Sequence, residues 1–174
     1  MPRRPHLIPI NRTAGAQPRS RGAAARPLTL AAIVLLVAGC SPDPVEIAVP
    51  KPAPEVAQAC DGLMKAMPAK VLDGKKRKAD PASILTTAYG DPPIEVTCGV
   101  APPAGMAEAQ SQCFEVNGVG WFAKQVTNGY IFTTIGRKVY LEIAVPSKYA
   151  PEANALTDVS DAIKAHNTLI TPCT

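Results

Sequence analysis

The sequence predicts an α+β fold, in which an antiparallel sheet of about four strands carries two helices on one face as a two-layer sandwich. Three observations lead to this class: helical apolar spacing near both ends of the region after residue 55, alternation of apolar and other residues between 94 and 145, and turn signals between the alternating segments. Antiparallel sheets commonly bury one face, so both helices are expected on that face.

Two segments have the spacing of amphipathic helices. In the first, apolar residues recur every three or four positions and stop before Pro68, namely Val56, Cys60, Leu63, Met64 and Met67. In the second, Leu156, Val159 and Ile163 follow Pro151 with the same spacing. Because proline is tolerated at the start of a helix but not in its interior, these prolines mark the end of a first helix and the start of a closing helix.

Alternation with a period of two predicts the strands. They are 94–100, 114–126, 131–135 and 139–145. Asn128-Gly129 is predicted to turn the chain between the second and third strands, and Gly136-Arg137 between the third and fourth. Residues 70–93 show no such period and are predicted to be irregular.

The net charge is unevenly distributed along the chain. The formal charge of +4 divides into +6 for residues 1–40, which hold six arginines and no acid, and −2 for residues 41–174. An uncharged, largely apolar run, 28–39, follows the arginines. It is too short to span a bilayer, which needs about 20 apolar residues, but it has the length of a signal-peptide core. We therefore interpret residues 1–39 as an export signal.

Cys40 lies at the junction between this apolar run and a polar, proline-rich segment. The residues Val37-Ala38-Gly39-Cys40 resemble the lipobox of bacterial lipoproteins. The resemblance implies that the chain is cut before Cys40, that the thiol is joined to diacylglycerol, and that lipid holds the protein on the outer face of the cell membrane. Two or three acyl chains are sufficient for stable anchoring. The alternative is a secreted protein in which Cys40 has no such role.

Five prolines fall between residues 42 and 54. Such spacing prevents helix formation and favours an extended chain. We therefore expect residues 40–55 to form a lipidated cysteine and a tether, and residues 56–174 to form a single α+β domain. Downstream of the tether, no apolar run of the sequence has the length of a membrane span.

Four cysteines remain in the predicted domain, namely Cys60, Cys98, Cys113 and Cys173. An even number in an exported domain predicts two disulfides, for which three pairings are possible. We favour Cys98 with Cys113, which lie at the ends of consecutive predicted strands, and Cys60 with Cys173. A redox pair or a metal site is the alternative, but no Cys-x-x-Cys motif is present and this region has a single histidine. No metal or cofactor is expected.

Few residues have a pattern typical of catalysis. His166 is predicted to be a solvated residue near the end of the closing helix rather than a catalytic one. Glu95, Glu115 and Glu142 lie on predicted strands and alternate with apolar residues, so we expect them on the solvent face. An envelope hydrolase that uses such carboxylates is the alternative interpretation.

The run KKRK at 75–78 is the densest positive charge of the predicted domain. We interpret it as a solvated loop. Anionic phospholipid headgroups or teichoic-type polymers are the alternative, because clustered lysines near a membrane each contribute about 1 kcal/mol. No series of aromatic residues accompanies the run, so nucleic acid is not an expected partner.

Several short motifs resemble those of one known family. They are Tyr89-Gly90-Asp91-Pro92-Pro93, Cys98-Gly99-Val100, VNGVGW at 116–121 and GRKVYLE at 136–142. Together they resemble an actinobacterial family of small envelope lipoproteins catalogued as domain of unknown function 3515, over about residues 56–165. The resemblance implies an exported, often lipid-anchored protein of unassigned activity, and it supplies no catalytic residues to carry over to this sequence. If the family has a binding surface, Asp91, Trp121 and Arg137 are the candidates for partner contact, since each lies beside or near a turn glycine.

These observations predict a non-enzymatic binding or assembly module in the cell envelope. Its expected partners are the membrane, through the lipid anchor, and a cell-envelope protein or polymer. An envelope hydrolase and a purely structural spacer are the alternatives.

Overall fold

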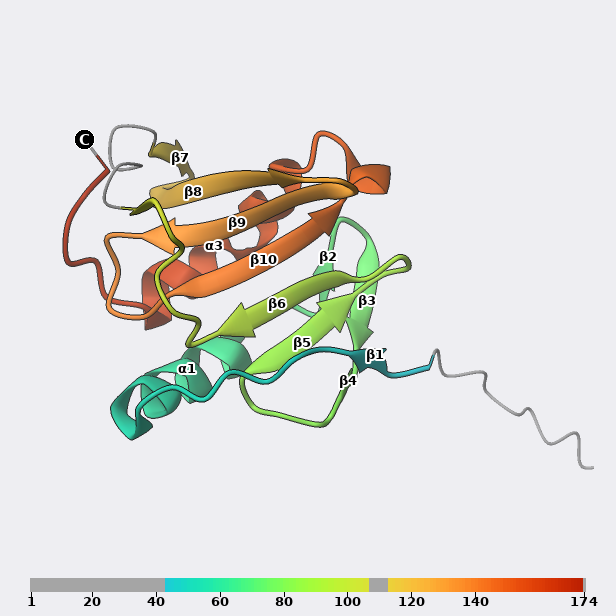
Figure 1. Ribbon diagram of the computed structural model, residues 1–174, viewed down its shortest axis with the longest axis horizontal. Helices are drawn as coiled ribbons and strands as arrows, with labels where there is room; N and C mark the ends of the chain where they lie inside the picture. Colours follow the sequence, from blue (N-terminus) through green and yellow to red (C-terminus); the bar gives the residue numbers. More distant parts are fainter. Residues whose placement is uncertain (1–42, 107–112, 174) are drawn as a thin grey trace, which may run out of the picture. The chain divides into compact units, whose positions relative to one another are not determined.

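The computed structural model describes residues 43–106 and 113–173, so the predicted export signal and Cys40 lie outside the described residues. The strands are β1 (Val45–Glu46), β2 (Lys70–Val71), β3 (Gly74–Arg77), β4 (Ala79–Asp80), β5 (Thr86–Tyr89), β6 (Ile94–Cys98), β7 (Phe114–Val116), β8 (Val119–Val126), β9 (Gly129–Ile135) and β10 (Leu141–Pro146). Eight of them form one antiparallel sheet in the order β2-β3-β5-β6-β10-β9-β8-β7, and β1 pairs in parallel with β4 (Figure 1).

Two helices share one hydrophobic core with this sheet (Figure 1). The first, α1 (Pro54–Ala66), has proline in its first turn, where a missing N–H costs no helical hydrogen bond. The second, α3 (Asn154–His166), has basic residues in its last turn, where they interact favourably with the helix dipole. The largest buried side chains of the core include Trp121, Tyr89, Leu63, Ile94, Leu141, Ile143, Leu156 and Ile163. The mixed α+β class is therefore confirmed.

The central strands β6 and β10 alternate as predicted. Buried residues occupy every second position, namely Ile94, Val96, Cys98, Leu141, Ile143 and Val145. Ile143 pairs with Val96 on one side and with Phe132 of β9 on the other, so apolar side chains lie opposite one another across three strands. The intervening residues, including Glu95 and Glu142, lie on the opposite face, which we call the outer face.

The sheet is larger than the expected four strands, and the interpretation of residues 70–93 as irregular was wrong. All four residues of β5 are buried, because the main core covers one of its faces and β1 covers the other, so no alternation marks this strand. Three of the four residues of β3 are basic, so its sequence lacks the apolar alternation that would predict a strand. The expected strand 114–126 is two strands, since Asn117 and Gly118 form a turn with φ values of 48° and 77°.

One predicted hairpin is confirmed, and the other connection is longer than expected. Two residues, 127–128, join β8 to β9. Residues 136–140 join β9 to β10, because the carboxyl-terminal segment packs into this loop: the amides of Ile170 and Thr171 donate to the Gly136 carbonyl at 2.7 and 3.0 Å. Gly136 has a φ of 67°, and a Cβ there would overlap the Thr171 carbonyl. This close approach therefore requires glycine.

The segment 43–53 belongs to the folded domain, so the expectation of a free tether was wrong over these residues. Val45 and Ile47 are buried in a small cluster with Ala88. Their amides donate to backbone carbonyls of the β4 segment at 2.9 and 3.0 Å. Two features explain this packing. Val45 and Ile47 alternate along the segment, so both can face the sheet, and Ala88 is small enough to leave room for them. The domain thus begins near Val45 rather than at residue 56.

Candidate functional site

The four cysteines of the domain form two disulfides, but in a different pairing from the favoured one. Cys60 of α1 is bonded to Cys98 of β6, and Cys113 is bonded to Cys173, with Cα–Cα distances of 5.7 and 5.8 Å. The strand order excludes the expected Cys98–Cys113 pair, because β10, β9 and β8 lie between β6 and β7 and neighbouring strands are about 4.8 Å apart. Each disulfide instead joins segments that packing brings together.

Two of the three expected contact residues are buried. Trp121 is 0% exposed in the core, and Arg137 is 7% exposed. The Arg137 guanidinium donates to the carbonyls of Asn167 at 2.7 Å and Gly118 at 2.8 Å, so it joins the end of α3 to the β7–β8 turn. Burial lowers the pKa of Arg137, an effect that the charge of Glu115 opposes. Both side chains stabilise the fold, which corrects the expectation of a contact surface at these positions.

Asp91, the third expected contact residue, lies on the surface. Its side chain is 92% exposed, and one carboxylate oxygen lies 3.8 Å from Nη1 of Arg77. It occupies the turn between β5 and β6. Lys148 donates to the Asp91 carbonyl at 2.6 Å, and the Tyr149 hydroxyl donates to the Pro92 carbonyl at 2.8 Å, so the turn is held in place.

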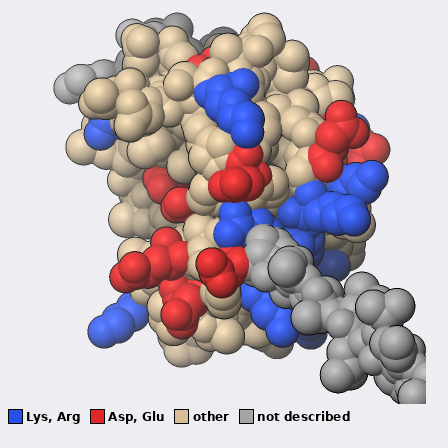
Figure 2. Space-filling view, turned by 90° about the vertical axis from the view of Figure 1, so that its right-hand side faces the viewer, with Lys and Arg blue, Asp and Glu red and all other residues tan. Residues whose placement is uncertain are grey.

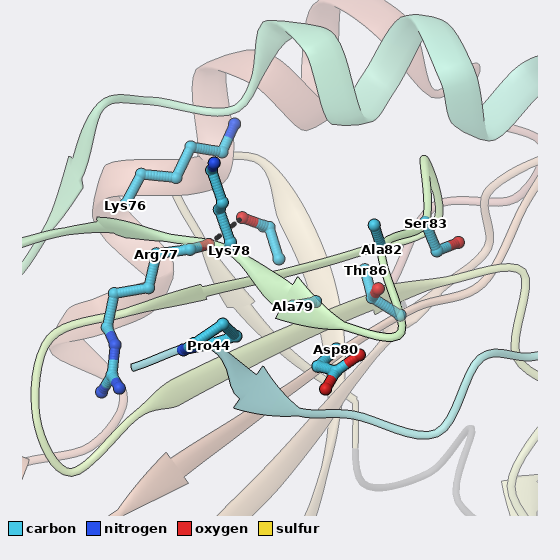
Figure 3. A pocket seen from close by; sticks show the side chains of 10 residues that line it. Pro44, Lys76, Arg77, Lys78, Ala79, Asp80, Ala82, Ser83 and Thr86 are labelled. Carbon is cyan, nitrogen blue, oxygen red and sulfur yellow. Dashed lines mark hydrogen bonds between the residues drawn. The ribbon is translucent and has the colours of Figure 1, made fainter. Parts of the chain in front are cut away.

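A cavity of about 820 Å³, which we call the basic pocket, opens beside β3 and β5 (Figure 3). Its lining includes Lys76, Arg77 and Lys78, one carboxylate, Asp80, and Pro44 from the amino-terminal segment. The cavity forms because β3 pairs with β5 over only two residues, after which the chain turns away and pairs with β1.

The basic side chains of the pocket point in different directions. Lys76 and Lys78 extend to the same side and Arg77 to the other (Figure 3), as strand alternation requires. Arg77 is engaged by the fold, since it donates to the carbonyls of Gly90 at 2.9 Å and Asp43 at 2.6 Å. Burial lowers the pKa of Lys76. Neither lysine forms an ion pair with a residue that the structure describes, so both ammonium groups are available for an anionic ligand.

The surface around the pocket carries charges of both signs. Figure 2, which views the molecule from the right-hand side of Figure 1, shows Lys and Arg side chains interspersed with Asp and Glu side chains on that face. On α1, Lys65 pairs with Asp61 at 2.7 Å. Within the pocket, the Thr86 hydroxyl is buried and has no hydrogen-bond partner among the described residues. The pocket lining itself holds three basic groups against one acidic group.

Two carboxylates lie near each other on the outer face. The register of β6 and β10 offsets Glu95 from Glu142 by two residues, and the backbone positions of such diagonal neighbours are about 7–8 Å apart. Burial raises the pKa of both groups; the charge of Glu142 raises that of Glu95 further, whereas Lys124 opposes the shift at Glu142. Glu142 and Lys124 also line a cavity of about 400 Å³. Glu115, on β7, is exposed.

His166 is exposed in the last turn of α3, as predicted. Within residues 43–106 and 113–173, no group of three or more His, Cys, Asp or Glu side chains is placed to hold a metal ion. None of the helices described here combines the length and the apolar character needed to cross a membrane.

Sequence patterns predict one wall of the basic pocket as a basic segment, but they do not predict the cavity. The run 75–78 was interpreted as a solvated loop, and the other walls come from Pro44, Asp80 and Thr86, which are distant or unremarkable in sequence. One signal was present: Val45 and Ile47 alternate with a glutamate, as in a strand.

Fold and site together define a disulfide-linked α+β domain with a candidate anion-binding pocket at one end of an antiparallel sheet. The chain belongs to the family described as "Protein of unknown function (DUF3515)", whose model matches residues 23–169. The resemblance of the short motifs is thereby confirmed for the family. No curated protein and no solved structure matches the chain significantly.

Proposed function

We propose that this protein is a lipid-anchored binding or assembly module of the actinobacterial cell envelope, held outside the cell membrane by lipid on Cys40. In this proposal it catalyses no reaction, and its basic pocket binds an anionic group of an envelope component. The pocket itself carries the proposal, because Lys76 and Lys78 line it and form no ion pair with any described residue.

Two features support an extracytoplasmic location. Disulfides persist in oxidising compartments, and this domain contains two of them. The arginine-rich leader, the apolar run and the lipobox-like residues that end at Cys40 support export with lipid attachment. Together they favour a protein that works outside the membrane.

Binding to a polyglycerol phosphate chain tests the pocket. We expect the Lys76→Ala, Lys78→Ala double variant of the full-length protein, in detergent, to bind this polymer about 30-fold more weakly, from about 1 kcal/mol per lysine. The control is Lys124→Ala, Lys138→Ala, which removes the same charge from exposed positions outside the pocket. Equal losses in the two double variants would show that binding does not use the pocket.

Metabolic labelling with a fatty acid tests the anchor. We expect label on the wild-type protein and none on a Cys40→Ala variant, which we also expect to leave the membrane fraction in mild detergent-free washes. A wild-type protein without label, or a variant labelled to the same extent, would rule out lipid on Cys40.

The carboxylate pair supports a second candidate function, an envelope hydrolase. Glu95 and Glu142 are diagonal neighbours on the outer face with raised pKa values, and glycosidases use a pair of carboxyl groups on either side of the bond that is cut. Hydrolysis of cell-wall fragments by the wild type, abolished in both Glu95→Gln and Glu142→Gln, is the expected result for this candidate. Unchanged wall fragments would exclude it.

A further inference from the structure

The amino-terminal segment limits how far the domain can lie from the cysteine that carries the lipid. The carbonyl of Asp43 accepts a hydrogen bond from Arg77 at 2.6 Å, and the Val45 amide donates to the carbonyl of Lys78 at 2.9 Å. Only two residues separate Asp43 from Cys40. Three residues of fully extended chain span at most about 11 Å. The end of β3 is therefore held close to the lipid-bearing residue, and the long tether is absent.

The part of the domain held there is basic. Lys76 and Lys78 flank Arg77, the residue that binds Asp43, and form no ion pair with any described residue. The potential of an anionic lipid surface decays over a Debye length of about 8–10 Å, which is similar to the reach of the connecting chain. The backbone of this basic segment therefore lies within the field of an anionic membrane surface, and the side chains of Lys76 and Lys78 extend from it on the side of β3 opposite Arg77 (Figure 3).

An exposed apolar side chain lies beside Lys76. Ile84 is 58% exposed, and it lines a small cavity with Lys76 and with the Lys65–Asp61 ion pair of α1. Lysines next to an exposed apolar residue are typical of protein surfaces that lie at a membrane interface, where the apolar group enters the headgroup region and the ammonium groups remain at the phosphates.

We infer that the domain lies directly on the membrane, with Lys76, Lys78 and Ile84 in contact with anionic phospholipid headgroups. This inference rests on the proposed lipid anchor at Cys40 and names the ligand of the basic pocket. The anchor brings the pocket to the bilayer, the lysines bind headgroup phosphates, and Ile84 enters the headgroup region. The domain is thus oriented relative to the membrane.

Fluorescence quenching by brominated lipid tests this orientation. The full-length, lipidated Ile84→Trp variant is reconstituted into vesicles of brominated phosphatidylcholine, with or without phosphatidylglycerol. We expect roughly twofold quenching with phosphatidylglycerol and little without it, because an interfacial side chain lies about 5–10 Å into the headgroup boundary. Trp121 is fully buried and adds the same background in every sample.

The matched control is Ile170→Trp, which places the probe at another exposed isoleucine, 66% exposed, in the carboxyl-terminal segment. We expect its emission to be the same in both kinds of vesicle. Equal quenching of the two probes, or no quenching of either in protein that carries the fatty-acid label, would overturn the orientation. Protein without the label would instead contradict the proposed function, so the two failures are distinguishable.

Charge reversal tests the contribution of the lysines. In the Ile84→Trp background, Lys76→Glu with Lys78→Glu is expected to abolish the quenching, whereas Lys124→Glu with Lys138→Glu, the same charge change away from the pocket, is expected to preserve it. Quenching that survives the first pair would contradict headgroup binding by the pocket. If that same variant also lost binding to polyglycerol phosphate, the ligand of the lysines would be a wall polymer instead of phospholipid headgroups.

Discussion

The two ends of the sheet are held together in different ways. At one end, β8, β9 and β10 contain eight, seven and six residues and form continuous antiparallel ladders over a core that includes Trp121. At the other end, β2, β3 and β5 contain two, four and four residues. There, segments distant in sequence complete the packing: β1 covers Ala88, and Arg77 binds the carbonyl of Asp43.

The difference separates a scaffold from a candidate binding site. Where β3 stops pairing with β5, the chain leaves the sheet and the basic pocket opens. Binding residues commonly lie on such irregular connections, positioned by a rigid framework. Substitutions in the long ladders should therefore lower stability most, and substitutions at the short-strand end should change binding with smaller losses of stability.

The largest effect is expected from Trp121→Ala, which creates a cavity beneath the long ladders. We expect the free energy of unfolding to fall by about 4 kcal/mol, as measured by urea denaturation. Phe122→Ala is the matched control, because Phe122 lies on the opposite face of the same strand and is only partly buried; about 1 kcal/mol is expected for it. A similar decrease in the free energy of unfolding for both variants would show that β8 does not bury one face much more than the other.

An intermediate effect is expected from Ile47→Ala at the other end of the sheet. Ile47 is 4% exposed but belongs to a small cluster, so we expect a loss of about 2 kcal/mol, at the low end for buried isoleucine. Hydrogen exchange should show protection of the Val45 and Ile47 amides in the wild type and reduced protection in the variant. The exposed neighbour Glu46→Ala should change little, and unprotected wild-type amides would mean that the segment is free.

The smallest effect is expected from Glu142→Gln, and it depends on pH. Burial raises the pKa of Glu142 in the folded state above its ordinary value of 4.5, so the folded state holds the proton more tightly. The contribution of Glu142 to the free energy of unfolding therefore decreases as the pH rises from the pKa of this group in the unfolded state to its higher pKa in the folded state. Near neutral pH the variant should be slightly more stable than the wild type, by less than about 1 kcal/mol, since the group is partly solvated.

That advantage should disappear below about pH 4, where the carboxyl is protonated in both states. Urea denaturation at the two pH values measures it, and Glu46→Gln, at an exposed position of β1, is the control. A stability difference that is the same at both pH values would mean that Glu142 titrates like a solvated carboxyl.

Local signals explain which elements could be predicted. The alternation in β6 and β10, the helical spacing before Pro68 and the hairpin at Asn128-Gly129 depend on residues close together in sequence; all of these elements are present, with the turn one residue earlier, at 127–128. Of the candidate site, only the basic run was recognised. Its pocket depends on β1 crossing the sheet near Ala88; the alternation of Val45 and Ile47 indicates a strand, but it does not indicate where that strand packs.

By itself, the sequence determined the α+β class, the positions of both helices and the central strands, because hydrophobic period and turn chemistry are properties of neighbouring residues. Only the tertiary structure decided which cysteines pair, that Trp121 and Arg137 are buried, and that residues 43–53 pack on the domain. These outcomes depend on strand order and on contacts between distant segments, and such contacts exist only once the sheet has formed.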